Sequence, residues 1–251
     1  IVVCLGEDAY AETPGNIEDL ELPENQLKLV VELSKLNKPI IAVFTEGRPR
    51  IIRKIEPLLS GIILAYWPGE QGANAIADVL FGDFNPSGKL PITYPRNPNS
   101  LVTYDHKYLD EVFESASPQI YSEEFNPQFA FGFGLSYTTF NYSPITFSSA
   151  TLEANGTIDV KVTVTNSGKI AGKESVEMYS SDLIASITPS VKRLRDFTKI
   201  YLLPGESKEV VFKLSAKDLA FINKDLKWIT EPGDFNITIG NQKKKLVYTT
   251  K

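Results

Sequence analysis

The sequence predicts an α/β region built on a parallel sheet, followed by an all-β region with an immunoglobulin-like sandwich. In residues 1–95, short apolar runs alternate with segments of helical period. This alternation is typical of a parallel sheet with crossover helices. From about residue 137 onward, short segments of period two follow one another between turns, as in an antiparallel sandwich. The length of 251 residues allows a sizeable core.

The first region is predicted to hold three strands and three helices. Continuous apolar runs are typical of strands buried on both faces, here residues 1–5, 39–47 and 61–67. Helical patterns follow them in residues 23–37, 48–59 and 69–82. The first helix is predicted to bury one apolar face, made of Leu27, Val30, Val31 and Leu33. Pro23 lies near its first turn, and Gly82 is predicted to end the last helix.

The chain begins inside the first predicted strand, without an initiator Met or a signal peptide. Three strands are also few for a parallel sheet of this kind. We therefore expect an α/β domain that is truncated at its start, in a chain that is a fragment or a processed product.

The second region shows its strands by strict alternation. Ile158, Val160 and Val162 recur at period two, and Val164 continues the pattern before the turn that follows. Further predicted strands cover residues 174–180, 192–202, 207–214, 233–240 and 244–250. Because this half has no cysteine, the sandwich must be of the disulfide-free type. The aromatic-rich segment 96–136 is too long for a simple connector, so we interpret it as a functional loop or as interdomain packing.

The small numbers of cysteine and histidine restrict the catalytic and metal sites that the chain can form. One cysteine, Cys4, and one histidine, His106, exclude an internal disulfide and a Cys/His zinc site, and any catalytic triad would need His106. The net charge of −5 argues against a nucleic-acid partner, and no apolar run approaches a membrane span. No phosphate-binding glycine motif is present, so nucleotide binding is weakly supported and no cofactor is implied. Acid–base chemistry therefore falls to carboxylates.

Ligands of parallel sheets bind beyond the carboxyl ends of the strands. Three loops follow such ends, at residues 6–24, 45–50 and 68–72. Their acidic residues are Glu7, Asp8, Glu12, Glu18, Asp19, Glu21, Glu24, Glu46 and Glu70. Glu12 stands out because Thr13-Pro14-Gly15 fixes the backbone beside it, although an acidic loop is more often a solvated surface. Arg48 and Arg50 could clamp a substrate carboxylate, but we favour an internal ion pair that orients the loop.

Taken together, the motifs resemble glycoside hydrolase family 3. In the α/β half, the resemblance rests on VVCLGEDAYAETPGN (2–16), EGRPR (46–50), the run from Trp67 to Arg96 and FAFGFGLSYTTF (129–140). In the second half, residues 162–180, 191–207 and 229–240 resemble the fibronectin type III-like domain that closes many family members. Each piece is weak by itself, but the ordered set covers nearly the whole chain.

The resemblance implies that residues 1–136, including the loop 96–136, are the C-terminal part of the family's α/β-sandwich domain. Residues 137–251 would then be the fibronectin type III-like domain. Family members are mostly exo-acting, retaining β-glucosidases and related β-glycosidases without a cofactor or metal. Similar enzymes are commonly periplasmic or secreted, and some are lysosomal. The expected substrate is a β-glucoside or oligosaccharide.

Retention needs two carboxylates about 5–5.5 Å apart. In the family, an aspartate nucleophile comes from a preceding TIM-barrel domain, and a glutamate in a segment similar to AYAETPG is the general acid/base. That motif maps the acid/base onto Glu12. Glu7 is the second candidate, although we favour a role in shaping the loop or pocket. Trp67 could line a sugar site by stacking, but its place at a strand end favours packing. The barrel is absent from this chain, so we expect the chain alone to be inactive.

Two other functions stay open. A non-catalytic carbohydrate-binding or scaffolding module would need an exposed aromatic platform, with candidates Tyr137, Phe140, Tyr142 and Trp228. A nucleotide-binding α/β protein is weaker, because the phosphate loop is lacking.

Overall fold

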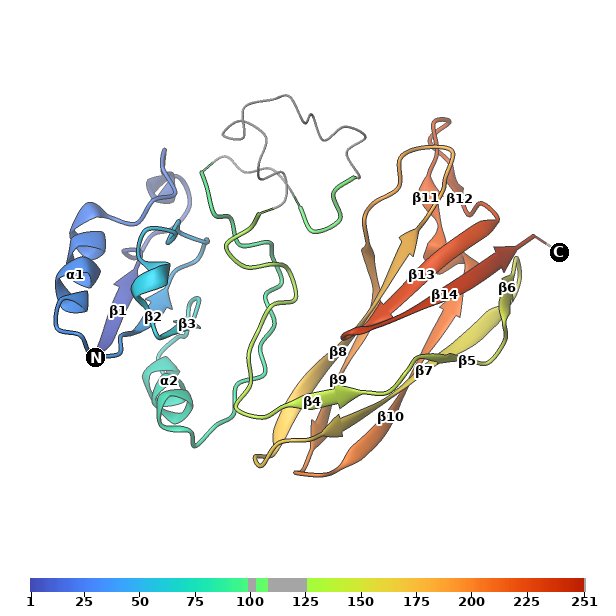
Figure 1. Ribbon diagram of the computed structural model, residues 1–251. Coiled ribbons are helices and arrows are strands. Elements are labelled where there is room, and N and C mark those ends of the chain that lie inside the picture. The colour runs from blue at the N-terminus through green and yellow to red at the C-terminus, as the bar shows by residue number, and fades with distance from the viewer. Residues whose placement is uncertain (99–102, 108–125, 251) are drawn as a thin grey trace. The chain divides into compact units, whose positions relative to one another are not determined.

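The computed structural model describes residues 1–98, 103–107 and 126–250 (Figure 1). The chain forms two compact units. The first comprises Ile1–Phe84 with the described residues of Leu90–Val102 and Glu123–Phe133, and the second comprises Asn85–Lys89 with the described residues of Thr103–Ser122 and Gly134–Lys251. Among these described residues, no helix is both long and apolar enough to cross a membrane.

The first unit is a partial parallel α/β sandwich. Its sheet has the order β1 (Val2–Gly6), β2 (Ile41–Thr45), β3 (Gly61–Leu64), and both pairings are parallel. The central strand β2 buries Ala42, Val43 and Phe44 in succession. That continuous burial confirms the prediction that this apolar run is covered on both faces.

Two α-helices accompany this sheet, one between β1 and β2 in the sequence and one after β3. Helix α1 (Glu24–Ser34) buries Leu27 and Val30, while Val31 is 42% exposed. The expectation that Val31 shares the buried face is therefore wrong, because consecutive helical residues point about 100° apart. Helix α2 (Gly72–Phe81) ends at Gly82, which adopts a left-handed conformation with φ 87° as predicted.

The predicted helix over residues 48–59 is absent. Only a short 3-10 turn, η2 (Glu56–Leu58), forms there. The Ile51 N–H donates to the Leu20 carbonyl at 2.8 Å, so this backbone pairs with a distant segment rather than within a helix. Ile52 and Ile55 are fully buried in the irregular segment, which explains the apolar pattern. A second 3-10 turn, η1 (Thr13–Gly15), lies in the loop after β1.

The second unit is an antiparallel β-sandwich, as predicted. One sheet has the order β10-β7-β4, with β5 also paired to β7, and the other has the order β6-β14-β13-β8-β9 (Figure 1). A two-stranded piece joins β11 to β12. The strand bounds are β4 Phe140–Tyr142, β5 Thr146–Phe147, β6 Thr151–Glu153, β7 Thr157–Asn166, β8 Gly172–Asp182, β9 Arg193–Leu202, β10 Ser207–Ser215, β11 Phe221–Ile222, β12 Trp228–Ile229, β13 Gly233–Ile239 and β14 Gln242–Thr249.

The sandwich core follows from the alternation seen in the sequence. Strand β7 buries the four residues Ile158, Val160, Val162 and Val164, which confirms the period-two prediction. They belong to one cluster with residues of the other sheet, such as Met178 and Phe235. A 3-10 turn, η3 (Ala216–Leu219), follows β10 and carries a capping box between Ser215 and Asp218.

Candidate active site

The carboxyl ends of the three parallel strands bring three loops together at one edge of the sheet. The Glu7 N–H donates to the Thr45 carbonyl at 3.1 Å, and the Glu46 N–H donates to the Tyr66 carbonyl at 3.1 Å. Gly6 allows this close approach, since a Cβ there would lie 2.0 Å from the Thr45 carbonyl oxygen. Residues that follow β1, β2 and β3 therefore meet where parallel sheets usually bind ligands.

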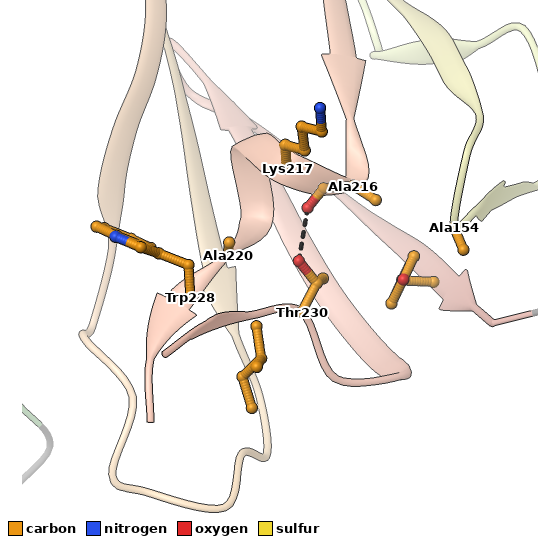
Figure 2. Close-up of a pocket in the computed structure, with 8 residues that line it drawn as sticks. Ala154, Ala216, Lys217, Ala220, Trp228 and Thr230 are labelled. Atoms are coloured by element: carbon orange, nitrogen blue, oxygen red, sulfur yellow. Dashed lines mark hydrogen bonds between the residues drawn. The ribbon is translucent and has the colours of Figure 1, made fainter. Parts of the chain in front are cut away.

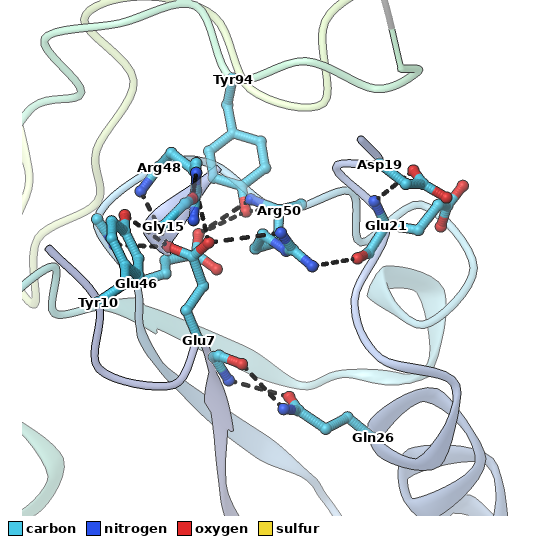
Figure 3. Close-up of polar contacts among 12 residues, drawn as sticks. Glu7, Tyr10, Gly15, Asp19, Glu21, Gln26, Glu46, Arg48, Arg50 and Tyr94 are labelled. Atoms are coloured by element: carbon cyan, nitrogen blue, oxygen red, sulfur yellow. Dashed lines mark hydrogen bonds and ion pairs between the residues drawn. The ribbon is translucent and has the colours of Figure 1, made fainter. Parts of the chain in front are cut away.

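Glu7 is the centre of a polar network at this edge (Figure 3). Its side chain is only 6% exposed, and Oε1 accepts a hydrogen bond from Arg48 Nε at 2.7 Å. Oε2 accepts from the Gly47 N–H at 3.0 Å, and Arg50 Nη1 lies 3.4 Å from Oε1. Burial raises the pKa of the Glu7 carboxyl, but hydrogen bonds from Arg48 and Gly47 outweigh it and hold that pKa below its usual value. The preferred interpretation of Arg48 and Arg50 as internal ion-pair partners is confirmed.

The same network fixes the loop after β1. Arg48 Nη1 donates to the Gly15 carbonyl at 2.6 Å, and its guanidinium lies 4.2 Å above the Tyr10 ring. The Tyr10 hydroxyl donates to Glu7 Oε2 at 3.2 Å. Gly15 must be glycine for this packing, since a Cβ there would lie 2.3 Å from Tyr10 Cδ2. Arg48 thus holds both ends of the segment in which Glu12 lies.

Glu12 lies at the exposed turn of this fixed segment. Its φ of 50° and ψ of −140° are unusual for a residue with a side chain, and backbone strain of this kind clusters at functional sites. Its carbonyl accepts the Gly15 N–H at 2.9 Å, which forms η1. Among the residues that the structure describes, none forms a hydrogen bond or ion pair with the Glu12 carboxylate. The carboxylate is therefore presented to solvent on a constrained backbone.

Trp67 follows β3 and contacts the same loop. Its ring meets Tyr10 edge to face, with centroids 5.6 Å apart and planes at 70°. Gly47 approaches closely, since a Cβ there would lie 2.4 Å from Trp67 Cζ2. The indole is nevertheless 68% exposed. The three site residues predicted from the sequence, Glu7, Glu12 and Trp67, thus belong to one set of adjoining loops.

A second, buried group lies beside this network, in which Glu46, a candidate from the sequence, contacts Tyr94, which was not one. Glu46 is 1% exposed, and burial raises the pKa of its carboxyl to about 7. The Tyr94 hydroxyl lies 2.9 Å from Glu46 Oε1 and 2.7 Å from the Arg50 carbonyl (Figure 3). Arg50 Nη2 also donates to the Glu21 carbonyl at 2.6 Å. No local pattern could have found Tyr94, because it lies 48 residues from Glu46.

The single histidine lies elsewhere in the chain. His106 belongs to the second unit, where Nδ1 lies 2.9 Å from the Thr103 carbonyl. Within the described ranges, no three His, Cys, Asp or Glu side chains are grouped so that they could hold a metal ion.

The second unit has a cavity of its own (Figure 2). Its volume is about 470 Å³, and its lining includes Lys217, Trp228 and Thr230. The Thr230 hydroxyl donates to the Ala216 carbonyl at 2.7 Å, while Trp228 is 64% exposed. Of the aromatic residues predicted as a platform, Phe140 and Tyr142 instead pack against the core, and the Tyr142 hydroxyl donates to Glu174 at 2.8 Å.

Known proteins resemble this chain over nearly its whole length. The chain is 38% identical over 247 residues to a periplasmic β-glucosidase of Salmonella typhimurium, covering 96% of the chain and 32% of that protein. It is 39% identical over 254 residues to a lysosomal β-glucosidase of Dictyostelium discoideum, covering 96% of the chain and 30% of that protein. The crystal structure of a Listeria innocua β-glucosidase in complex with glucose superposes with a TM-score of 0.87 at 28% identity, covering 98% of this chain and 36% of that one.

The family models divide the chain in the order that the fold shows. Residues 1–137 match the glycosyl hydrolase family 3 C-terminal domain, and residues 174–243 match the fibronectin type III-like domain. The chain spans about a third of the length of the relatives it matches. It belongs to glycoside hydrolase family 3 and corresponds to the C-terminal portion of such enzymes.

Proposed function

We propose that the chain is the C-terminal portion of a retaining, exo-acting β-glucosidase in which Glu12 is the general acid/base. The observation that carries the proposal is the contrast between Glu12 and its loop. The backbone of the loop is held by Glu7 and Arg48, whereas the Glu12 carboxylate is exposed and unpaired among the described residues. A general acid needs this combination of fixed position and access to substrate.

The proposed reaction is a double displacement. An aspartate from a TIM-barrel domain outside this chain attacks the anomeric carbon, while Glu12 donates its proton to the departing glycosidic oxygen. The Glu12 carboxylate then accepts a proton from water as the water attacks the glycosyl-enzyme. This sequence requires the two carboxyl groups to lie about 5–5.5 Å apart in the complete enzyme.

Two further residues support Glu12 in this proposal. Glu7 shapes the pocket, because its hydrogen bonds fix Tyr10 in the loop after β1 and the Gly47 backbone in the loop after β2. Trp67 offers an exposed indole face next to the loop, against which the apolar face of a sugar ring can stack. Both side chains bind or position the substrate and take no part in proton transfer.

The test compares aryl β-glucosides with good and poor leaving groups in the full-length enzyme that contains this chain. The Glu12→Gln variant is expected to lose about 10²–10⁴-fold in kcat/KM on the poor leaving group, which needs protonation, and much less on the good one. Glu18→Gln, an exposed carboxylate further along the same segment, is the matched control and should leave both rates unchanged. Equal losses on both substrates would contradict the acid role.

The proposal also covers the domain boundary, the activity of the chain alone and the location of the complete enzyme. We place the boundary between the two domains at residues 136–137. The 251-residue chain alone is expected to show no glycosidase activity, since it holds one carboxylate of the pair. The complete enzyme is proposed to be periplasmic or secreted, or lysosomal in a eukaryote. Turnover by the isolated chain that Glu12→Gln abolishes would contradict this account.

A carbohydrate-binding role of the second unit is the alternative, favoured by the exposed Trp228 beside the cavity (Figure 2). Calorimetry of the 251-residue chain with glucan oligosaccharides tests it. Binding that Trp228→Ala abolishes and Trp67→Ala preserves would support the alternative. No binding heat, or loss of binding with Trp67→Ala alone, would remove it.

A further inference from the structure

In the buried group formed by Glu46, Tyr94 and Arg50, the hydrogen-bond contacts show which oxygens must carry a proton. The Tyr94 hydroxyl has one proton, yet its oxygen is within hydrogen-bond distance of two others. The Arg50 carbonyl, at 2.7 Å, can only accept. The Tyr94 hydroxyl proton therefore lies in the shorter contact, to the Arg50 carbonyl, because two oxygens 2.7 Å apart with no proton between them would repel each other. The 2.9 Å contact to Glu46 Oε1 then needs a proton from Glu46.

The surroundings of Glu46 agree with this count. Within the described parts of the chain, Glu46 Oε1 accepts one long backbone hydrogen bond, from the Arg50 N–H at 3.4 Å, and Oε2 is buried without a hydrogen-bond partner. In the same parts of the chain, no arginine or lysine side chain forms an ion pair with Glu46. The neighbouring Arg50 guanidinium is directed to Glu7 and to the Glu21 carbonyl instead. A buried carboxylate would be costly in this setting, whereas a neutral acid is tolerated.

We propose that Glu46 is a positioning residue for the loop that carries Glu12. In acidic to neutral solution it is a neutral carboxylic acid that donates a hydrogen bond to the Tyr94 hydroxyl oxygen, and Arg50 therefore stays paired with Glu7. The positioning of the loop stands on the contacts above. Only its consequence for catalysis rests on the proposed role of Glu12.

The charged and titratable groups that face Glu46 are Glu7 after β1, Arg50 in its own loop, Tyr66 after β3 and Tyr94. Burial is the largest cause that raises the pKa of Glu46 to about 7, and the negative charge of Glu7 adds to it. Above that pH, an ionised Glu46 competes with Glu7 for Arg50, whose Nε has no partner within the described residues. Loss of Arg50 from Glu7 loosens the network that holds Tyr10 and Arg48.

The first measurement follows the glutamate side-chain carboxyls of the 251-residue chain by carbon NMR between pH 4 and 9. The Glu46 resonance is assigned with the Glu46→Gln variant or, if that variant does not fold, through bonds in the unaltered chain. We expect its midpoint near 7, well above the unperturbed value of 4.5. A midpoint at the ordinary value would overturn the proposal.

The second measurement reads the loop itself. In the Trp228→Phe variant, Trp67 is the single tryptophan, and it contacts Tyr10 of the Glu12 loop. Its emission is expected to change with the same midpoint as Glu46, and to stay flat from pH 5.5 to 8 once Glu46→Gln is added. His106→Gln removes the single histidine of the chain and is the control, which should leave the transition in place.

The outcomes separate the two proposals. If Glu46 titrates near 7 while Trp67 emission stays constant, Glu46 is a buried acid without a positioning role, and the inference fails. Neither readout involves cleavage of a glycoside, so a failure of Glu12→Gln to show leaving-group dependence would remove the catalytic proposal alone.

Discussion

The two units of the chain differ in what they bury. The buried charged residues of the described chain, Glu46 and Arg50, both belong to the first unit, at the edge where the strands end. The buried polar residues of the second unit, Asn166 and Ser180, are neutral, and its core is otherwise apolar. A charged interior orients a loop, whereas an apolar interior supplies stability. We therefore expect changes at the strand-end edge of the first unit to alter pH dependence and loop geometry, and changes in the apolar core of the second unit to alter stability.

Each unit contains one of the two tryptophans, so the comparison can be tested by fluorescence. The largest effect is expected from Phe235→Ala in the sandwich core, where the side chain is 1% exposed. Removing a buried phenylalanine costs about 3–5 kcal/mol. Urea unfolding of the Trp67→Phe variant, followed by Trp228, measures the loss. Phe197→Ala, an exposed residue of β9, is the matched control, and an equal loss in both variants would contradict the assigned core.

The next effect separates the units by pH. The pKa of Glu46 is about 7 in the folded chain against 4.5 when unperturbed, so the folded state binds more protons than the unfolded state between these values. Stability is therefore highest below pH 4.5 for this group, falls as pH rises, and levels off above 7, a total of about 3 kcal/mol. Glu46→Gln should remove this slope. Glu7, whose pKa is lowered, acts in the opposite sense and loses its contribution as pH falls.

The measurement is urea unfolding of the Trp228→Phe variant, followed by Trp67 at several pH values. An unchanged slope in the Glu46→Gln variant would show that another group carries the pH dependence.

Prediction from sequence succeeded where the physics was local. The four residues of β7 at period two were found because burial on one sheet face imposes that spacing on consecutive residues. An internal ion pair of Arg48 was expected from the sequence, but only the structure identifies Glu7 as its partner. Glu12 stood out among many acidic residues through the adjacent Thr13-Pro14-Gly15, and the family resemblance gave it the role of the acid/base.

Prediction from sequence failed where contacts between distant parts of the chain determine the local structure. The segment 48–59 has a helical apolar pattern, but Ile51 pairs with Leu20 and the helix does not form. Tyr94 could not be connected to Glu46, because only the folded chain brings residues 48 positions apart together. The strain at Glu12 likewise has no sequence pattern of its own.

A smaller effect is expected at the loop that carries Glu12. Gly15→Ala introduces a Cβ 2.3 Å from Tyr10 Cδ2, so the ring or the loop must move. Overpacking of this kind costs about 1–3 kcal/mol. Near-ultraviolet circular dichroism should report the change in the contact between Tyr10 and Trp67. Gly88→Ala is the control, since a Cβ there meets nothing within 4 Å, and an unchanged spectrum in Gly15→Ala would argue against the fixed loop.

The smallest effect on stability is expected within helix α1, where two adjacent valines differ in burial. Val30 is fully buried, whereas Val31 is exposed, although the two are adjacent and identical in type. Val31→Ala should change stability by less than about 0.5 kcal/mol, since Val31 is 42% exposed and alanine has the higher helix propensity. Val30→Ala should cost roughly 1.5–3 kcal/mol, the burial free energy of a valine side chain. Thermal unfolding followed by Trp67 compares the two. Equal losses would mean that the helix buries a wider face, as the sequence pattern alone suggests.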